Sequence, residues 1–408
     1  MDYRTMVNPT YYTAKTTAIM LAEAGNEDAK RMAADLKLWD SLRHSREGEV
    51  PFPEMELQAL LAGTRLAIEA RYAAVSHLLK SGEYQSLLDV GCGYTPRAVD
   101  CARAGIDYVG LDVPVVAEKL QRYAEASGMG GGHPVYMGGD ATNTSSLLRA
   151  ARPLAGKLLI SSEGLLHYLS ADEAEQLIIG IQKTLESHGG AWVTSDFGLS
   201  IDSFSIANMR DPAAAALYLK TRSEITEEVQ IYHNGVAFWE EERKLAFLED
   251  HGMLVEKLPL YQEGEALQSM HAIAEDKRET MRSLLGAASI WRMTADPAFS
   301  NAVQGSRQVD HLIVDYRVSG EKLFFMTKGR VDTLTAPILL EIFDQNSQGI
   351  RSVTIDAMQL QYISSAGLRT LLIMVKKLGE GSVRLVGAPD AVKEIFHATG
   401  FDQMIIVK

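Results

Sequence analysis

The stretch LLDVGCGYTPRAVDCARAGIDYVGLD, residues 87–112, decides the fold of the region around it. An apolar run ending at Val90 is followed by the small-residue turn Gly91-Cys92-Gly93, a helix-like segment, and a second apolar run that stops at Asp112. This pattern predicts strand, glycine loop, helix and strand, which is half of a nucleotide-binding βαβ unit. Glycines let the backbone approach a ligand closely. An acid at the end of the second strand can accept both hydroxyls of a ribose.

The glycine loop lacks the third glycine of a dinucleotide-binding fingerprint, so a phosphate-binding loop is disfavoured. D-x-G-x-G followed by a strand-terminal acid resembles motifs I and II of class I S-adenosylmethionine (SAM) methyltransferases. The resemblance implies that Asp89, Gly91, Gly93 and Asp112 bind SAM. The alternative is an ordinary turn between strand and helix with a surface aspartate.

Composition limits the classes of partner. The chain has 408 residues, 46% of them hydrophobic, with a net charge of −13. This charge disfavours nucleic acid and anionic membrane surfaces. The two cysteines, Cys92 and Cys101, form neither a zinc pattern nor a disulfide framework, so we expect no metal and a cytoplasmic location. No signal sequence and no run of membrane-spanning length is recognised.

The order of elements predicts an α/β protein with three structural parts joined by one linker. Residues 1–80 have helical periodicity and are expected to form a lid or a simple packing layer. Residues 81–295 alternate strands and helices, which predicts a mostly parallel, Rossmann-like sheet of seven strands. The strands are expected at 86–90, 107–111, 134–137, 157–161, 190–196, 253–260 and 288–294. The polar residues 296–307 are interpreted as a linker, and 308–408 as a small β/α domain.

The segment 198–250 is helical and partly aromatic, and it follows the fifth predicted strand. It is a candidate wall of the methyl-acceptor pocket, although an aromatic stripe is more often part of a core. The aromatic and histidine residues concerned are Phe204, Tyr218, Tyr232, His233, Phe238 and Trp239.

After the fourth predicted strand stands SSEGLLHYLS, residues 161–170. Together with DVGCGYTPR it resembles the leucine carboxyl methyltransferase-like family over roughly residues 60–295. The resemblance implies that Arg71, in the last helix before the first strand, grips the carboxylate of the cofactor's methionine part. An arginine fork suits a carboxylate because it offers two parallel donors. A solvated helix residue is the alternative for Arg71.

Three further positions are candidate site residues. Asp140, after the third strand, is placed to accept the exocyclic amine of adenine, or else it serves as a turn or N-cap residue. Glu163 and His167 are candidate catalytic and cofactor-facing groups for a hydroxyl acceptor, which needs a base, whereas a carboxylate acceptor needs none. A packed or capping role is the alternative for His167. The loop departs from the family's Leu-Gly-x-Gly-x-Asp-x-Arg form, so the acceptor does not transfer.

The last hundred residues contain GRVDTLTAP followed by YISSAGLR. This pair closely resembles the STAS domain of anti-sigma-factor antagonists, from about 309 to 408. The resemblance implies a bacterial protein that binds a serine kinase and is switched by phosphorylation at a helix start. Many members have Asp before the phosphorylated pair. Here that position is Ser364, and Asp356, at the end of the preceding predicted strand, is the nearest recognisable family acid.

Ser364 and Ser365 are the phosphorylation candidates. We predict Ser364 as the N-cap of the helix and Ser365 in its first turn, where the helix dipole favours a phosphate. Ser365 is the better acceptor candidate, unless both serines merely cap the helix.

Two functions follow for the whole chain. The first is a SAM-dependent O-methyltransferase, with a carboxylate or hydroxyl on a small-molecule acceptor, fused to a STAS regulatory module. The second is a non-catalytic SAM sensor that signals through the STAS domain as an anti-sigma-factor antagonist.

Overall fold

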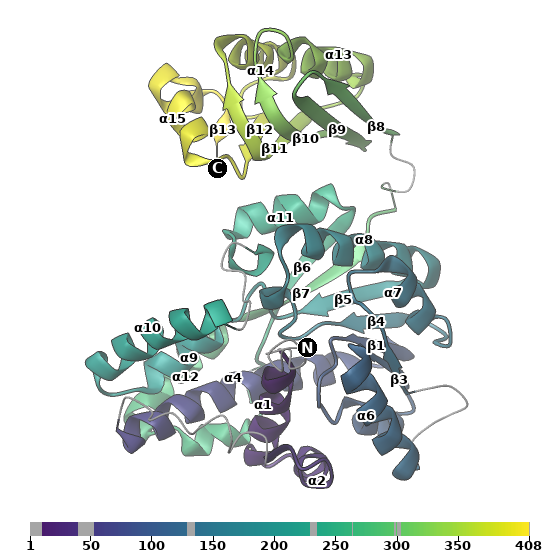
Figure 1. Ribbon diagram of the computed structural model, residues 1–408, viewed down its shortest axis with the longest axis vertical. Coiled ribbons are helices and arrows are strands. Elements are labelled where there is room, and N and C mark those ends of the chain that lie inside the picture. Colours follow the sequence, from purple (N-terminus) through teal and green to yellow (C-terminus); the bar gives the residue numbers. More distant parts are fainter. Residues whose placement is uncertain are drawn as a thin grey trace, which may run out of the picture. The chain divides into compact units, whose positions relative to one another are not determined.

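The computed structural model describes residues 10–39, 53–128, 135–228, 235–262, 264–297, 299 and 303–407. The chain divides into two compact units, which are shown together in Figure 1. The first unit contains residues 1–239 and 254–295. The second contains residues 240–253 and 296–408. Each unit is described by itself below.

The first unit is built on a seven-stranded sheet with strand order β3-β2-β1-β4-β5-β7-β6. The pairs among β1 to β5 are parallel, whereas β7 is antiparallel to β5. The sequence thus correctly predicts a mostly parallel sheet with a late pair of strands. The strands are β1 (Ser86–Val90), β2 (Asp107–Asp112), β3 (Tyr136–Gly138), β4 (Leu158–Ser161), β5 (Gly190–Thr194), β6 (Met253–Pro259) and β7 (Ser289–Ala295).

Helices cover the sheet and extend beyond it. They are α1 (Thr10–Glu23), α2 (Glu27–Asp35), α4 (Glu54–Lys80), α5 (Arg97–Ala104), α6 (Pro114–Ala126), α7 (Thr144–Ala151), α8 (Ala171–His188), α9 (Ile201–Asn208), α10 (Pro212–Glu228) and α12 (Arg278–Ala287). Short 3₁₀ turns are η2 (Leu166–Tyr168), η3 (Val236–Phe238), η4 (Gln268–Ala272) and η5 (Glu275–Lys277). Residues 54–80, within the part predicted to be helical, form the single helix α4.

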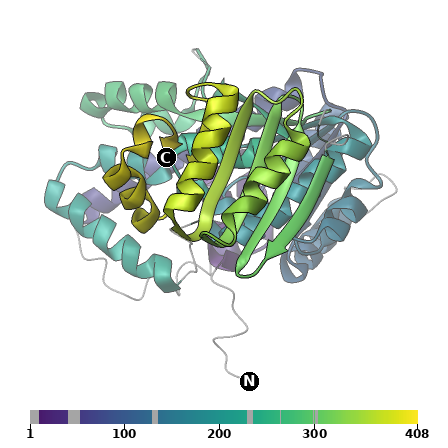
Figure 2. The same cartoon turned by 90° about the horizontal axis from the view of Figure 1, so that it is seen from above.

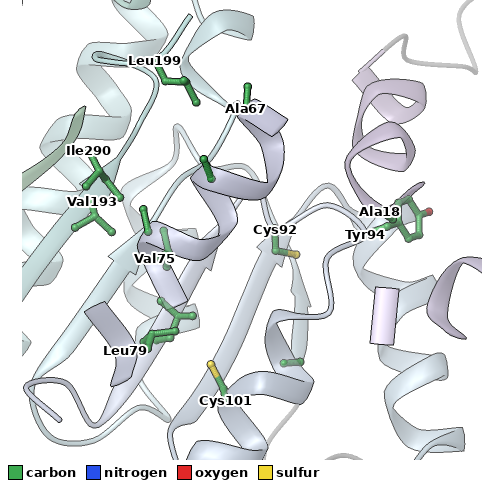
Figure 3. Packing of buried hydrophobic residues seen from close by; sticks show 14 of the residues in the cluster. Ala18, Ala67, Val75, Leu79, Cys92, Tyr94, Cys101, Val193, Leu199 and Ile290 are labelled. Atoms are coloured by element: carbon green, nitrogen blue, oxygen red, sulfur yellow. The ribbon is translucent and has the colours of Figure 1, made fainter. Parts of the chain in front are cut away.

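The long helix α4 links the N-terminal helices to the sheet. Its residues Ala67, Val75 and Leu79 belong to one buried apolar cluster with Val193 of β5 and Ile290 of β7 (Figure 3). Helix α9 packs closely against α4, because a β-carbon built at Gly63 would lie only 2.3 Å from the carbonyl oxygen of Phe204. A glycine is therefore required where these two helices meet.

The second unit is a six-stranded sheet of order β13-β12-β11-β10-β9-β8, with the helices that follow β10 on one face (Figure 2). Its strands are β8 (Val303–Val309), β9 (Leu312–Ser319), β10 (Lys322–Val331), β11 (Ser352–Ile363), β12 (Val383–Val386) and β13 (Ile406–Val407). Its helices are α11 (Glu241–Asp250), α13 (Ala336–Asn346), α14 (Ser365–Leu378) and α15 (Asp390–Thr399), and it has the 3₁₀ turn η7 (Phe401–Gln403). Strand β10 pairs in parallel with β11 and antiparallel with β9.

Two features of the second unit differ from the sequence interpretation. Part of the stretch 296–307, interpreted as a linker, is strand, because β8 begins at Val303 and pairs with β9. The strand lies at the edge of the sheet and its side chains are mostly exposed, so its polar composition resembles that of a linker. Strand β11 also continues to Ile363 rather than ending at residue 356. Among the described residues, no helix is long and apolar enough to cross a membrane.

Candidate functional site

The glycine loop after β1 is tied to the acid that ends β2. Gly91 and Gly93 have positive φ angles of 67° and 51°. The Gly93 N–H donates to Oδ2 of Asp112 at 2.8 Å, and the Val113 N–H donates to Oδ1 at 2.8 Å. Burial raises the pKa of Asp112, whereas the two backbone donors work in the opposite direction. Because each carboxylate oxygen has two lone pairs, the fixed Asp112 can still accept two hydroxyl groups.

Two other segments lie against this glycine loop. A β-carbon built at Gly93 would lie 3.4 Å from Cβ of Ala14 in α1, so the N-terminal helix runs past the loop. One built at Gly91 would lie 3.2 Å from a methyl of Leu165, which follows β4. The loop is therefore placed between the N-terminal helical layer and the segment that contains Glu163 and His167.

Asp89 lies inside the protein rather than at a ligand surface. It is 3% exposed and accepts hydrogen bonds from the Ser161 hydroxyl at 2.7 Å and the Tyr108 hydroxyl at 3.3 Å. Burial raises the pKa of Asp89 to about 6, although the nearby Arg97 works in the opposite direction. Its hydrogen bonds join β1 to β2 and β4, so Asp89 stabilises the strand that leads into the glycine loop.

Glu163 is the centre of a buried charged cluster. Its Oε2 accepts from Nη2 of Arg97 at 2.7 Å, and its Oε1 lies 3.6 Å from Nε of Arg71. Arg97 is fully buried, with Nη1 donating to the Tyr72 carbonyl and the Ser76 hydroxyl and its guanidinium over the Tyr72 ring at 3.7 Å. Burial is the largest single influence and lowers the pKa of Arg97, but Glu163, Tyr72 and Asp89 together outweigh it, so the pKa is raised.

This cluster excludes one interpretation of Arg71 and restricts the role of Glu163. Arg71 is 6% exposed, so it is not a solvated helix residue. One carboxylate oxygen of Glu163, Oε2, is engaged by Arg97. Its Oε1 is buried and makes no hydrogen bond within the part of the chain that the structure describes. An ammonium group entering beside Arg71 would find an acceptor there.

His167 lies close to a second carboxylate, Asp196, which follows β5. Its Nδ1 is 3.9 Å from Oδ2 of Asp196, and its ring packs edge-on against Phe238 with centroids 5.2 Å apart. Asp196 is 4% exposed and accepts three backbone N–H groups, from Gly164, Leu165 and Leu166, at 2.7–2.9 Å. Asp196 therefore sets the course of the loop after β4 and places His167 beside an exposed aromatic ring.

Asp140 forms a local turn. Its Oδ1 accepts from both the N–H and the hydroxyl of Thr142, at 2.8 and 2.7 Å. The N-cap of α7 is Asn143 rather than Asp140. Asp140 is exposed, so its second carboxylate oxygen faces solvent near the end of β3. The turn interpretation thus describes its contacts, and a contact with adenine remains a proposal.

The serine pair of the second unit has the predicted local geometry. Ser364 is the N-cap of α14, and its hydroxyl accepts from the Gly367 N–H at 3.4 Å. Ser365 is exposed and begins the helix. The Ser364 N–H donates to the Val331 carbonyl, which joins this helix start to the loop that carries Leu334, 73% exposed.

The sequence interpretation missed two residues of the first site. Arg97 and Asp196 were not among the predicted site residues, yet they hold the Glu163 side chain and the backbone that follows it. Arg97 follows the first predicted strand and Asp196 is the last residue of the fifth, at the edge of the sheet where ligands bind, which is the signal that could have identified them. Tyr232 and His233 of the predicted acceptor wall lie outside the described residues.

Comparison with known sequences identifies the C-terminal part. Residues 306–408 match the STAS domain family, so the STAS prediction is confirmed. A Bordetella bronchiseptica protein described as an anti-sigma factor antagonist, BtrV, is 40% identical over 63 residues. That match covers 15% of this chain and 54% of that protein, so the chain spans about half the length of the curated relative.

Comparison with solved structures finds two kinds of protein that are similar to parts of this chain. Magnesium protoporphyrin IX methyltransferase from Synechocystis PCC 6803, with bound SAH, is 14% identical with a TM-score of 0.36, covering 66% of this chain and 94% of that chain. An anti-sigma factor antagonist from Mycobacterium paratuberculosis is 20% identical with a TM-score of 0.21, covering 26% and 84%. The strand order and the site residues, rather than these similarities, bear on function.

Proposed function

We propose that the chain is a SAM-dependent O-methyltransferase joined to a STAS regulatory module. The observation that carries the proposal is the hydrogen bond from the Gly93 N–H of the glycine loop to Oδ2 of Asp112, the acid at the end of β2. This bond lies in a sheet in which β7 stands between β5 and β6 and runs antiparallel to β5. This arrangement leaves the carboxylate fixed and open to further donors at the edge of the sheet where ligands bind.

The side chains present fit SAM along its length. Asp112 would hold the ribose, and Asp140 would accept the adenine amine. Arg71 would bind the methionine carboxylate, and Oε1 of Glu163, which lacks a hydrogen bond within the described residues, would accept the ammonium. When bound, SAM supplies a methyl group on a sulfonium for a single in-line displacement. The protein's task is then to orient the acceptor oxygen and exclude water.

We propose that the methyl acceptor is a carboxylate oxygen of a small molecule; a hydroxyl oxygen is the alternative. A carboxylate acceptor needs no base. This suits a site in which Oε2 of Glu163 is already engaged by Arg97 at 2.7 Å. For a hydroxyl acceptor, His167 would be the base, with Asp196 orienting its ring.

Calorimetry with SAM tests the cofactor assignment. Asp112→Ala should lose two charge-assisted hydrogen bonds to the ribose, costing about 2–4 kcal/mol of binding. Asp107→Ala, at the exposed start of the same strand, is the matched control and should bind like the wild type. Equal SAM affinity in the two variants would remove Asp112 from the site.

A SAM-sensing protein without catalysis is the second candidate, favoured by the engagement of Glu163 with two arginines. Incubation with methyl-labelled SAM and a cell extract, followed by mass spectrometry, separates the candidates. A labelled product together with SAH supports the transferase. SAM binding by calorimetry without any SAH release supports the sensor.

For the second unit we propose that Ser365 is phosphorylated by a serine kinase of the anti-sigma type, in the bacterial cytoplasm. Ser365 is exposed at the start of a 14-residue helix, where a phosphate is stabilised by the dipole and adds charge to the surface near Leu334. Ser365→Asp should weaken capture of the kinase in a pull-down from extract, whereas Ser365→Ala should leave capture intact.

Thermal melts complete this test. Ser364→Ala should lower stability by about 1 kcal/mol, because it removes the N-cap. Ser365→Ala should leave the melting temperature nearly unchanged. If Ser365→Ala destabilises as much as Ser364→Ala, Ser365 is structural, and its proposed role as a switch fails.

A further inference from the structure

Helix α11 belongs to the second unit by its contacts but to the first by its position in the chain. It lies between η3 and β6, so residues of the first unit, Trp239 and Leu254, flank the segment on both sides. Its own segment, 240–253, groups with residues 296–408. Any displacement of α11 must therefore be transmitted through the peptide chain to residues next to it in the first unit.

The second unit's sheet has one face in its apolar core and another that carries buried charge. Phe325 of β10 and Ile355 of β11 point into the core, whereas Arg317, Phe324 and Asp356 occupy alternate positions. Arg317 is 7% exposed and Phe324 4%, although neither belongs to that core cluster. Something other than helices α13 and α14 therefore covers the face that Arg317 occupies.

The charges of α11 face this side of the sheet. Glu249 accepts from Nζ of Lys322 in β10 at 3.0 Å. Asp250 is 2% exposed, and burial together with the charge of Asp356 raises its pKa, while Arg317 works in the opposite direction. Arg243 stands two helical turns before Asp250; burial lowers its pKa, and the charge of Asp356 works in the opposite direction. Helix α11 thus contributes an acid, Asp250, that is influenced by Arg317, and an arginine, Arg243, that is influenced by Asp356.

The end of α11 is locked by a glycine. Gly252 has φ of 72°, and a β-carbon there would lie 2.2 Å from the ring of Phe299. The Gly252 carbonyl accepts from the Asp296 N–H at 2.8 Å. The Phe299 ring in turn lies under the Arg317 guanidinium, 4.3 Å from it. The segment that leaves the first unit's last strand therefore packs on the end of α11.

The charged contact is incomplete. Oδ1 of Asp250 and both Nε and Nη2 of Arg317 are buried and make no hydrogen bond within the described part of the chain. Two buried opposite charges whose hydrogen bonds are unfilled have little margin over the cost of desolvation. The packing of α11 on the sheet is therefore easier to disturb than a contact in which every buried polar atom is hydrogen-bonded.

The N-terminal end of α11 is connected to the proposed acceptor site by a short stretch of the chain. Phe238, three residues before Glu241, packs edge-on against His167 within the first unit. Phe238 is 45% exposed, and η3, which it ends, contacts η2. A change in the path of residues 239–241 would therefore reposition the ring that lies against His167.

We propose that α11 is the coupling element through which the state of the STAS module reaches the acceptor side of the methyltransferase site. The inference rests on the proposed function, because it identifies His167 and Phe238 as acceptor-facing. It requires that disturbing the buried charges of Asp250 and Arg317 alters residues 236–239 and 164–168, while the cofactor loop at residues 90–95 is left unchanged.

Hydrogen–deuterium exchange on the full chain tests the proposal with Arg317→Met. Exchange should rise about fivefold or more in residues 240–253 and measurably in 236–239 and 164–168, with residues 90–95 unchanged. Arg351→Met, in the exposed pair with Glu321, is the matched control and should change none of these segments. Asp250→Leu combined with Arg317→Met removes both charges together and should bring exchange back toward the wild-type rate.

A rise confined to 240–253 would overturn the proposal, because α11 would then be a cover without connection to the site. A rise across the whole chain in the single variant that persists in the double variant would also overturn it, since the effect would be general unfolding. SAM calorimetry on the same proteins tests the proposed function separately. A wild type that binds no SAM removes that function, while the exchange pattern still decides whether α11 transmits a change.

Discussion

The two units each bury an arginine beside an acid, and they satisfy these charges differently. Arg97 in the first unit has a carboxylate at 2.7 Å, a carbonyl, a hydroxyl and an aromatic face. Arg317 in the second unit has the rings of Phe299 and Phe324, while two of its nitrogens make no hydrogen bond within the described residues. The first cluster is built to hold its backbone in place, and the second is built loosely enough to be displaced.

The pKa shifts of the two buried arginines differ in the same way. The pKa of Arg97 is raised, because Glu163, Tyr72 and Asp89 together outweigh the cost of burial, whereas burial lowers the pKa of Arg317. The acid opposite Arg317, Asp250, has a raised pKa for the same reason. A charge pair thus stabilises its surroundings only where hydrogen bonds replace the lost water.

Breaking the first cluster should have the largest effect. Glu163→Ala leaves Arg97 buried without its carboxylate, and we expect a loss of about 3–5 kcal/mol in the free energy of unfolding. Urea denaturation monitored by circular dichroism measures it. Glu279→Ala, in an exposed pair with Arg282, is the control and should cost less than about 1 kcal/mol. A small effect of Glu163→Ala would mean that Arg97 is stabilised by its other contacts.

The glycine beneath Phe299 comes next. Gly252→Ala combines a positive φ with a β-carbon 2.2 Å from the ring, and we expect about 2–4 kcal/mol of destabilisation. Gly105→Ala has a similar φ of 66° and no atom within 4 Å of the new carbon, so strain alone should cost about 1 kcal/mol. Thermal melts of both variants isolate the contact with Phe299. Equal losses would show that the ring moves aside freely.

A pH series sharpens the comparison at Asp89, which lies beside Arg97. The pKa of Asp89 in the folded protein is about 6, above its ordinary value of 3.8, so the folded state binds more protons between these values. The stability from this group is complete below about pH 4 and is lost as pH rises through 6. Between pH 5 and 7.5 the wild type should lose about 1.4 kcal/mol relative to Asp89→Asn. Parallel urea curves at both pH values would contradict this shift.

The smallest effect is expected at the exposed rim of the second cluster. Glu249→Gln breaks the bond to Lys322, but both side chains are about half exposed, so the loss should be less than about 1 kcal/mol. The same melts performed at high salt should reduce the difference further. A loss comparable with that of Gly252→Ala would mean that the exposed contact between Glu249 and Lys322, rather than buried Asp250 and Arg317, holds α11 on the sheet.

Much of the fold was predictable because its signals are local. The turn at Gly91 and Gly93, the acid at Asp112, and the cap at Ser364 each depend on neighbours within a few residues or on adjacent strands. The strand β8 was not predictable in the same way, since an edge strand buries few side chains and lacks apolar alternation. The roles of Arg71 and Glu163 could be suggested by resemblance, but not their mutual contact.

What the sequence by itself determined is the order of elements, the seven-stranded sheet, the STAS domain, and the residues gathered at the ends of β1 and β2. Periodicity and turn chemistry encode the elements and the sheet locally, whereas the STAS domain was indicated by resemblance to its family. Only the tertiary structure decided that Glu163 binds Arg97, 66 residues away, and that Asp196 holds the loop carrying His167. The same is true of α11, which packs with a sheet that begins some fifty residues later. Such contacts depend on which buried charges meet after the chain has closed, and local sequence patterns carry no record of that pairing.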